Sequence, residues 1–203
     1  RGRAEPSQPD NGGDQVVVQR ADHGDQAARI NPVWIERHLV RKVVEQVVEV
    51  AVEVIEGELR SYERVHNAVR GAEVVFHLGA LGSVPRSVQD PLTSSAVNIE
   101  GTLNVLLAAR DSGVRRVVYS SSSSVYGSAG ELPRTEAMPA DPISPYGVAK
   151  LAAERYCVSF SRVYDSFESV VLRYFNVFGP RQSPFSQYAA VVPRFITAIH
   201  RGE

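Results

Sequence analysis

Short apolar runs alternate with helical patterns along most of this chain, and this alternation limits the fold more than any other feature. Three nearly continuous apolar runs are typical of strands buried in a parallel sheet: residues 74–78, 116–120 and 169–174. Four stretches have helical spacing of apolar residues: 61–71, 94–112, 146–164 and 189–201. This order predicts repeated βαβ units, and therefore an α/β fold with a doubly wound parallel sheet.

Polar and small residues follow the predicted strands at the point where each one ends. They comprise Gly79–Ser83, Ser120–Ser124 and Asn176. Ligands of open parallel sheets bind outside the carboxyl ends of the strands. We therefore expect the functional site at this edge of the sheet.

The first part of the chain has a different character. Residues 1–32 are rich in Gly, Asp, Gln, Arg and Pro, and we expect them to be irregular. Residues 33–54 are rich in Val at roughly helical spacing, which favours a helix, with a strand as the alternative because Val is a mediocre helix former. We therefore divide the chain into an atypical segment, residues 1–54, and a domain over residues 55–203.

Composition excludes several classes of partner. The net charge is −1, so neither nucleic acid nor an anionic membrane surface is expected to bind. Cys157 is the only cysteine, which excludes an internal disulfide and a multi-cysteine metal site, and its helical context is typical of a small buried residue. We expect no metal. Without a membrane-spanning run or a signal-peptide core, the cytoplasm is the expected location.

Tyr146 and Lys150 form the first chemical motif. They lie four residues apart just inside a predicted helix start, so they share one helix face. An ammonium beside a phenol favours the phenolate and should lower the pKa of the tyrosine from about 10 toward neutrality. Tyr146 is then a candidate general base, although such a pair is also compatible with a solvated helix face.

A run of serines, Ser120–Ser124, supports the catalytic interpretation. It follows the apolar run Val117–Tyr119 and precedes Val125-Tyr126-Gly127, inside a folded unit. A flexible linker is the alternative for such a run. A hydroxyl at a strand end can instead hydrogen-bond a substrate oxygen and pass its proton to Tyr146.

Several motifs in order resemble one enzyme family. They are Ser-Ser-Ser-x-x-Val-Tyr-Gly, Ser-Pro-Tyr-Gly-x-x-Lys and Leu-Arg-Tyr-Phe-Asn-Val-Phe-Gly-Pro, within residues 120–180. This pattern resembles the extended short-chain dehydrogenase/reductase family, the NAD-dependent epimerases and dehydratases, which have a Rossmann-type fold. It is most similar to UDP-sugar 4-epimerases. The stretches at 81–91 and 181–195 are similar to the branch that acts on UDP-N-acetylhexosamines.

The resemblance implies a role for individual residues. Tyr146 is implied as the catalytic base, Lys150 as its partner and as a clamp on the nicotinamide ribose, and Ser122 as the hydroxyl that contacts the sugar. The cofactor NAD is implied to lie against Glu58, Leu59, Leu78, Gly79, Ala80, Asn98, Ser120, Tyr146, Lys150 and Tyr174. The nucleotide sugar is implied to lie against Gly82, Ser83, Ser122, Tyr146 and Asn176.

The implied reaction is transient oxidation at C4 of the sugar, followed by re-reduction from the other face. NAD is regenerated and acts as a cofactor. A sister activity, 4,6-dehydration, uses an Asp-Glu pair just before Val-Tyr-Gly, and this chain has Ser123 and Ser124 there. That substitution disfavours a dehydratase. Family members commonly dimerise through two long helices, which implies a homodimer through residues 94–112 and 146–164.

The chain departs from the family at its start. The family opens with a strand and a Gly-x-x-Gly-x-x-Gly turn that holds the pyrophosphate, and residues 1–54 contain no such turn. Its loss should weaken NAD binding by several kcal/mol. We expect a fragment that also lacks the C-terminal substrate part. The alternatives are a reductase or dehydratase with the same residues, and a non-catalytic remnant without a complete NAD site.

Overall fold

The structure is a computed structural model, and it describes residues 16–18, 53–128, 132–179 and 191–202. Its centre is a three-stranded sheet with the order β3-β4-β5, built from β3 (Val74–His77), β4 (Arg116–Ser122) and β5 (Glu168–Tyr174). Both pairings are parallel. Parallel neighbours require crossover connections, and helices supply them here. The predicted parallel α/β architecture is confirmed.

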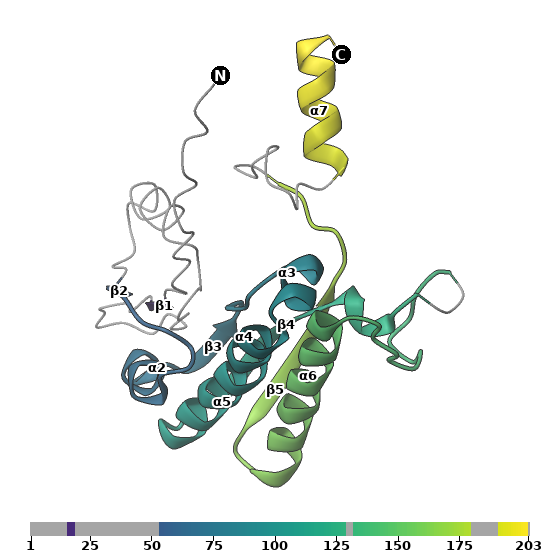
Figure 1. The fold of residues 1–203 in the computed structure, drawn as a ribbon. Helices are drawn as coiled ribbons and strands as arrows, with labels where there is room; N and C mark the ends of the chain where they lie inside the picture. Colours follow the sequence, from purple (N-terminus) through teal and green to yellow (C-terminus); the bar gives the residue numbers. More distant parts are fainter. Residues whose placement is uncertain (1–15, 19–52, 129–131, 180–190, 203) are drawn as a thin grey trace.

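Helices cover one face of this sheet within the described residues (Figure 1). They are α2 (Tyr62–Val69), α5 (Gly101–Asp111) and α6 (Pro145–Val163). The covered face of β4 buries Val117, Tyr119 and Ser121, whereas the side chains between them are only half-buried. This alternation follows from the two-residue period of a strand, so each strand presents one set of side chains to the helices.

The predicted helix over residues 94–112 consists of three consecutive pieces. They are α4 (Pro91–Ser95), the π-helical turn η1 (Ala96–Glu100) and α5. Inside the π turn, Asn98 is buried, and its backbone carbonyl accepts a hydrogen bond of 2.7 Å from the Thr102 hydroxyl. A π turn widens a helix locally and often marks a functional position. Here it brings the Asn98 side chain to the site described below.

Two short helices were not predicted from the periodicity of apolar residues. α3 (Val84–Gln89) is capped by Ser83, and the 3₁₀ turn η2 (Ser123–Tyr126) follows β4 directly. β4 itself extends two residues further than predicted, so Ser121 and Ser122 belong to the strand. Elements this short contain too few residues to show a period.

The N-terminal predictions are only partly tested. Val16–Val18 forms the strand β1, paired antiparallel with β2 (Glu53–Ile55). This corrects two predictions: residues 1–32 are not wholly irregular, and the helix expected over 33–54 does not include its last two residues. The physical reason is the β-branched valine, whose preference for extended backbone prevails in these short runs. The remainder of residues 1–54 lies outside the described residues.

The last helix, α7 (Val191–Arg201), agrees with the prediction for 189–201 apart from residues 189 and 190, which lie outside the described residues. Cys157 is fully buried in α6, and burial raises the pKa of its thiol to about 12. The prediction that it is a small core residue is confirmed.

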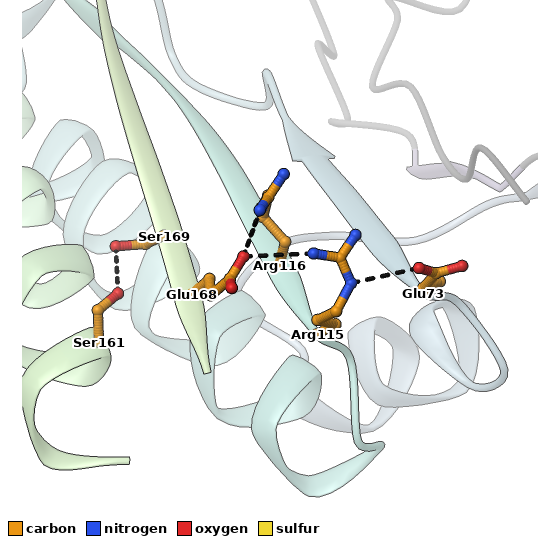
Figure 2. A network of polar contacts seen from close by, with 6 residues as sticks. All are labelled: Glu73, Arg115, Arg116, Ser161, Glu168 and Ser169. Carbon is orange, nitrogen blue, oxygen red and sulfur yellow. Dashed lines mark hydrogen bonds and ion pairs between the residues drawn. The ribbon is translucent and has the colours of Figure 1, made fainter. Parts of the chain in front are cut away.

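A chain of ion pairs joins the amino ends of the strands, far along the sheet from the serine run. Arg115 contacts both Glu73 and Glu168, and Arg116 donates to Glu168 at 2.7 Å (Figure 2). The Ser161 and Ser169 hydroxyls hydrogen-bond at 2.7 Å beside them. These charges are exposed, and exposed ion pairs contribute at most about 1 kcal/mol each. We regard this end of the sheet as structural.

None of the helices within the described ranges has the length and apolar character that crossing a membrane requires.

The position of the core predicts that truncating two helical leucines changes the free energy of unfolding by different amounts. Leu106 in α5 is fully buried, and Leu92 in α4 is 83% exposed. We expect Leu106→Ala to lower the free energy of unfolding by about 2–5 kcal/mol. Leu92→Ala should change it by less than about 0.5 kcal/mol. Urea unfolding followed by circular dichroism measures both, and equal losses would contradict the described core.

Candidate active site

Tyr146 lies in the first turn of α6, where two hydrogen bonds and a proline fix the helix start. The Ser144 hydroxyl caps the helix by accepting from the Gly147 amide at 3.1 Å, and Pro145 occupies the first turn. The Tyr146 amide donates to the Ser87 hydroxyl at 3.0 Å, which ties α6 to α3. The Ser122 side chain lies close enough to the Tyr146 phenol to lower its pKa. The tyrosine and the serine predicted from the motifs therefore meet.

Gly147 permits this approach. A β-carbon at this position would lie 2.7 Å from the Ser124 carbonyl oxygen and 2.9 Å from the Pro142 side chain. Distances under 3.0 Å would force backbone apart, so any larger residue here would push α6 away from the serine run. The glycine after Tyr146 is required for contact between helix and strand end.

Lys150 lies one turn further along α6 with its side chain only 3% exposed. Its ammonium donates to the Ser120 carbonyl oxygen at 2.9 Å and lies 4.9 Å from the centre of the Tyr119 ring. Burial penalises the charged form and lowers the pKa of Lys150 to about 8. A buried amine with this pKa loses its proton close to neutral pH.

The expected effect of Lys150 on Tyr146 is wrong for this structure. The pKa of Tyr146 is raised, chiefly by burial, and the hydrogen bond from Ser122 offsets part of that rise. Lys150 is 5.9 Å from the centre of the Tyr146 ring and donates to Ser120 instead. The sequence places the two residues on one helix face, but it cannot show that the ammonium is directed at the strand or that the phenol is shielded from water.

Ser122, the last residue of β4, has a second function besides its contact with Tyr146. Its hydroxyl accepts from the Ser124 amide at 3.1 Å and so caps η2. This turn bends the chain away from the sheet directly after the strand. The serine run therefore belongs to a strand end and a helical turn, and the alternative of a flexible linker is excluded.

The segment after β3 carries the next group of predicted residues. Leu78 is 43% exposed, and Gly79 and Ala80 are half-buried. The Asn98 amide group braces this segment through Leu81, accepting from its amide at 2.8 Å and donating to its carbonyl oxygen at 3.1 Å. The π turn of the helix thus holds the segment after β3 in place through Asn98.

Gly82 and Ser83 complete that segment. Gly82 is exposed with open space around it, whereas Ser83 has a φ of 119°. A residue with a side chain rarely adopts positive φ, and such strain concentrates at functional sites. The Ser83 hydroxyl also accepts from the Arg86 amide at 3.0 Å, so the strained residue caps α3.

Glu58 and Leu59 lie before α2, and their side chains differ in burial. The Leu59 side chain is fully buried under Gly101 in the core, so only its backbone is available to a ligand, and its carbonyl oxygen accepts from Asn104 at 2.9 Å. Glu58 is half-buried and paired with Arg60.

Tyr174 ends β5 directly beside Ser122, its partner in the strand register, and is 42% exposed. Asn176 is exposed two residues further on. The motif at residues 181–190 lies outside the described residues.

Motif reading missed three residues of this site: Ser87, Glu154 and Arg173. Ser87 holds the start of α6. Glu154 and Arg173 form a buried ion pair at 2.8 Å behind the serine run. A signal for Glu154 existed, because it continues the Tyr146 and Lys150 face at the next i+4 position. Nothing in the sequence shows that Arg173 meets it.

At the end of β4 the fold thus brings together a phenol, a serine hydroxyl and a buried lysine. A family model with the description "NAD dependent epimerase/dehydratase family" matches residues 9–203. This chain belongs to that family. The match confirms the resemblance drawn from the motifs, and it begins well before the region where those motifs start.

Relatives within the family are nucleotide-sugar enzymes. A UDP-glucose 4-epimerase of Mycolicibacterium smegmatis is 44% identical over 131 residues, which are 64% of this chain and 41% of the relative. The solved UDP-N-acetylglucosamine 4-epimerase of Methanobrevibacter ruminantium, in complex with UDP-N-acetylmuramic acid, is 42% identical with a TM-score of 0.68 and covers 73% of this chain and 47% of its own. The UDP-glucose 4-epimerase of Thermotoga maritima with UDP-glucose is 33% identical with a TM-score of 0.69, covering 82% and 60%. The chain spans less than half the length of the curated relatives it matches.

The family is NAD-dependent, and the residues present fit a bound NAD at this edge of the sheet. The fit rests on the exposed strand end at Leu78, braced by Asn98, and on the buried Lys150 amine beside the Ser122 and Tyr146 pair. The described residues contain no group of three or more His, Cys, Asp or Glu side chains arranged for a metal ion.

Lys150 gives the site a measurable signature. The chain has only two lysines, Lys42 and Lys150, so Lys42→Arg leaves a single lysine. We expect the ¹³Cε resonance of Lys150 to titrate with a pKa of about 8, as its burial implies. After unfolding in urea the same resonance should titrate near the ordinary value of about 10.4. An ordinary pKa in the folded chain would contradict the buried position of the amine.

Proposed function

We propose that this chain carries the cofactor-binding and catalytic part of an NAD-dependent nucleotide-sugar 4-epimerase that acts on UDP-hexose or UDP-N-acetylhexosamine. The observation that carries the proposal is the position of Ser122 at the end of β4, close enough to the Tyr146 phenol to lower its pKa, with the Lys150 ammonium held by the Ser120 carbonyl oxygen of the same strand. The names of the relatives support the UDP sugar and the 4-epimerisation.

In the proposed reaction, Tyr146 removes the proton of the C4 hydroxyl and later returns it. Ser122 donates a hydrogen bond to the same sugar oxygen and orients it toward Tyr146. The chemistry that a bound NAD would supply is reversible hydride transfer at C4, which would leave no net oxidation. Removing a proton from the phenol at neutral pH requires positive charge close to it, because burial alone raises the pKa of Tyr146.

The remaining cofactor contacts are assigned from position. The segment after β3 is partly open to solvent at Leu78, Gly79 and Ala80, and Asn98 holds it through a hydrogen bond to Leu81. At the end of the neighbouring strand β4, Lys150 donates to the Ser120 carbonyl oxygen. Tyr174 lies next to Ser122 in register. Glu58 and the backbone of Leu59 are proposed for the adenine end of the cofactor.

Gly82, Ser83 and Asn176 are proposed to border the nucleotide sugar. Gly82 leaves open space, and the strained backbone of Ser83 supports a functional position. Asn176 is exposed beyond the end of β5, at the same edge of the sheet as Ser122. The assay described below, with UDP-glucose and UDP-N-acetylglucosamine, distinguishes a hydroxyl from an N-acetyl group at C2 of the sugar.

Dehydration is the weaker candidate. A dTDP-glucose 4,6-dehydratase from Streptomyces venezuelae is 28% identical with a TM-score of 0.69, so the fold serves both activities. Elimination of water needs an acid near the sugar. Here Ser123 and Ser124 occupy η2, directly after Ser122, and neither can supply one.

The decisive experiment measures NAD⁺ binding and turnover in the purified chain. We expect NAD⁺ to raise the melting temperature saturably, because it binds the native state. UDP-glucose and UDP-N-acetylglucosamine should interconvert with their C4 epimers without net NADH formation. Tyr146→Phe should lower kcat by about 10²–10⁴-fold while NAD⁺ still binds.

Tyr156→Phe is the matched control, since Tyr156 is also on α6 but is 39% exposed. It should leave kcat within about twofold. Net NADH formation would indicate a reductase or dehydrogenase. Neither a thermal shift nor turnover would reject the proposal and identify the chain as a non-catalytic remnant.

We also propose a homodimer through residues 94–112 and 146–164. The support is an exposed apolar set on α6, with Val148 50% exposed and Val163 66% exposed, together with Tyr156. Exposed apolar side chains along a regular helix are typical of interaction surfaces. The cytoplasmic location stays a prediction from the sequence.

Light scattering after size-exclusion chromatography tests the dimer. We expect twice the mass of the chain for the parent and a single mass for Tyr156→Glu, because a buried unpaired carboxylate is costly. Leu132→Glu, at an 84% exposed position outside these helices, should leave the dimer intact. A parent that elutes as a monomer at micromolar concentration would reject the proposal.

A further inference from the structure

A buried carboxylate lies behind the catalytic lysine. Glu154, one helical turn after Lys150, is only 5% exposed. Its Oε1 accepts from the Ser121 hydroxyl at 2.5 Å and from Arg173 Nε at 3.0 Å, and its Oε2 accepts from Arg173 Nη2 at 2.8 Å. Burying a carboxylate is expensive unless it is paired in this way. The proposed chemistry leaves this group without a role.

These contacts join the three elements that carry the site. Ser121 lies on β4 between Ser120, which anchors the lysine, and Ser122, which contacts Tyr146. Arg173 lies on β5 directly opposite Ser121 in the strand register. Glu154 thereby fastens α6 to the two strand ends. A small shift of any one element would change the distance between Tyr146 and Ser122.

The same contacts also bind the turn that follows Ser122. The Arg173 guanidinium lies 4.7 Å from the centre of the Tyr126 ring, and Tyr126 ends η2. A guanidinium over an aromatic face is attractive, more so when both are shielded from water. Arg173 is therefore held by a carboxylate on one side and by an aromatic ring on the other.

The charges of this cluster bear on Lys150. Glu154 favours the protonated amine, while burial disfavours it, and burial has the larger effect. Arg173 contacts both oxygens of Glu154, so its positive charge opposes the negative charge of Glu154 close to Lys150. The titratable and charged groups facing Lys150 are Tyr146, Glu154 and Cys157 on α6, Tyr119 on β4, His77 on β3 and, through Glu154, Arg173 on β5.

We propose that Glu154 and Arg173 are positioning residues that hold the two strand ends against α6 and balance each other's charge next to Lys150. The assignment rests on the proposed function only in treating Tyr146 and Lys150 as the reacting pair. A purely structural ion pair would stabilise the fold without setting the protonation of the lysine. Buried pairs of that kind are often replaceable by apolar residues at little cost.

The test titrates Lys150 in the full chain carrying Lys42→Arg, with ¹³Cε-labelled lysine and without NAD or sugar. Glu154→Gln removes a negative charge that favours the ammonium, so the pKa of Lys150 should fall by about one unit. Arg173→Met removes the positive charge that cancels Glu154, so the pKa of Lys150 should rise by about one unit. The double variant Glu154→Gln, Arg173→Met should return close to the parent.

Arg173→Lys is the matched control, because it keeps the positive charge but loses the bidentate hydrogen bonds to Glu154. It should leave the pKa of Lys150 near that of the parent and lower kcat more than it changes KM. If Arg173→Met does not fold, the double variant Glu154→Leu, Arg173→Met replaces the ion pair by two apolar residues. The pKa of Lys150 in this variant should equal that in the double variant Glu154→Gln, Arg173→Met. Shifts of the same sign in both single variants, or none in folded protein, would overturn the proposal.

The titration and the enzymatic assay fail independently. Opposite shifts of Lys150 in a chain without epimerase activity would uphold the charge balance and reject only the proposed reaction. An active epimerase whose Lys150 does not respond to either variant would reject only the role of Glu154 and Arg173.

Discussion

The buried ammonium of Lys150 is the constraint on which the rest of the site depends. A charge with 3% exposure needs partners at fixed positions, and it finds them in the Ser120 carbonyl oxygen and the Tyr119 ring of β4. This requirement draws α6 onto the end of β4. The Tyr146 phenol is thereby brought to Ser122, and Gly147 must be small for the helix to come that close.

The site is assembled from contacts between elements distant in the sequence. Asn98 in the π turn braces the strand end at Leu81, Ser87 in α3 receives the Tyr146 amide, and Glu154 in α6 reaches Arg173 in β5. The first contact joins a helix to a loop, the second joins two helices, and the third joins a helix to a strand end. The carboxyl edge of the parallel sheet is consequently held by several contacts between elements, whereas the opposite edge carries exposed ion pairs that contribute little.

Sequence patterns predicted the central fold well, because strands buried on a parallel sheet and amphipathic helices have distinct periods. The apolar run at Val117 was found where expected. Short elements were missed: Val16–Val18 is too short to show a period, and its strand forms only by pairing with β2. The lowered pKa predicted for Tyr146 failed because burial is a tertiary property.

The sequence by itself determined the family and the order of the central strands and helices, and it selected Ser122, Tyr146 and Lys150 as candidates, because these depend on local spacing and residue type. Only the tertiary structure decided what surrounds them. It directed Lys150 at Ser120, placed Leu59 in the core, and paired Glu154 with Arg173. Burial and long-range contacts determine the protonation and orientation of the site side chains, and the spacing of residues along the chain predicts neither of them.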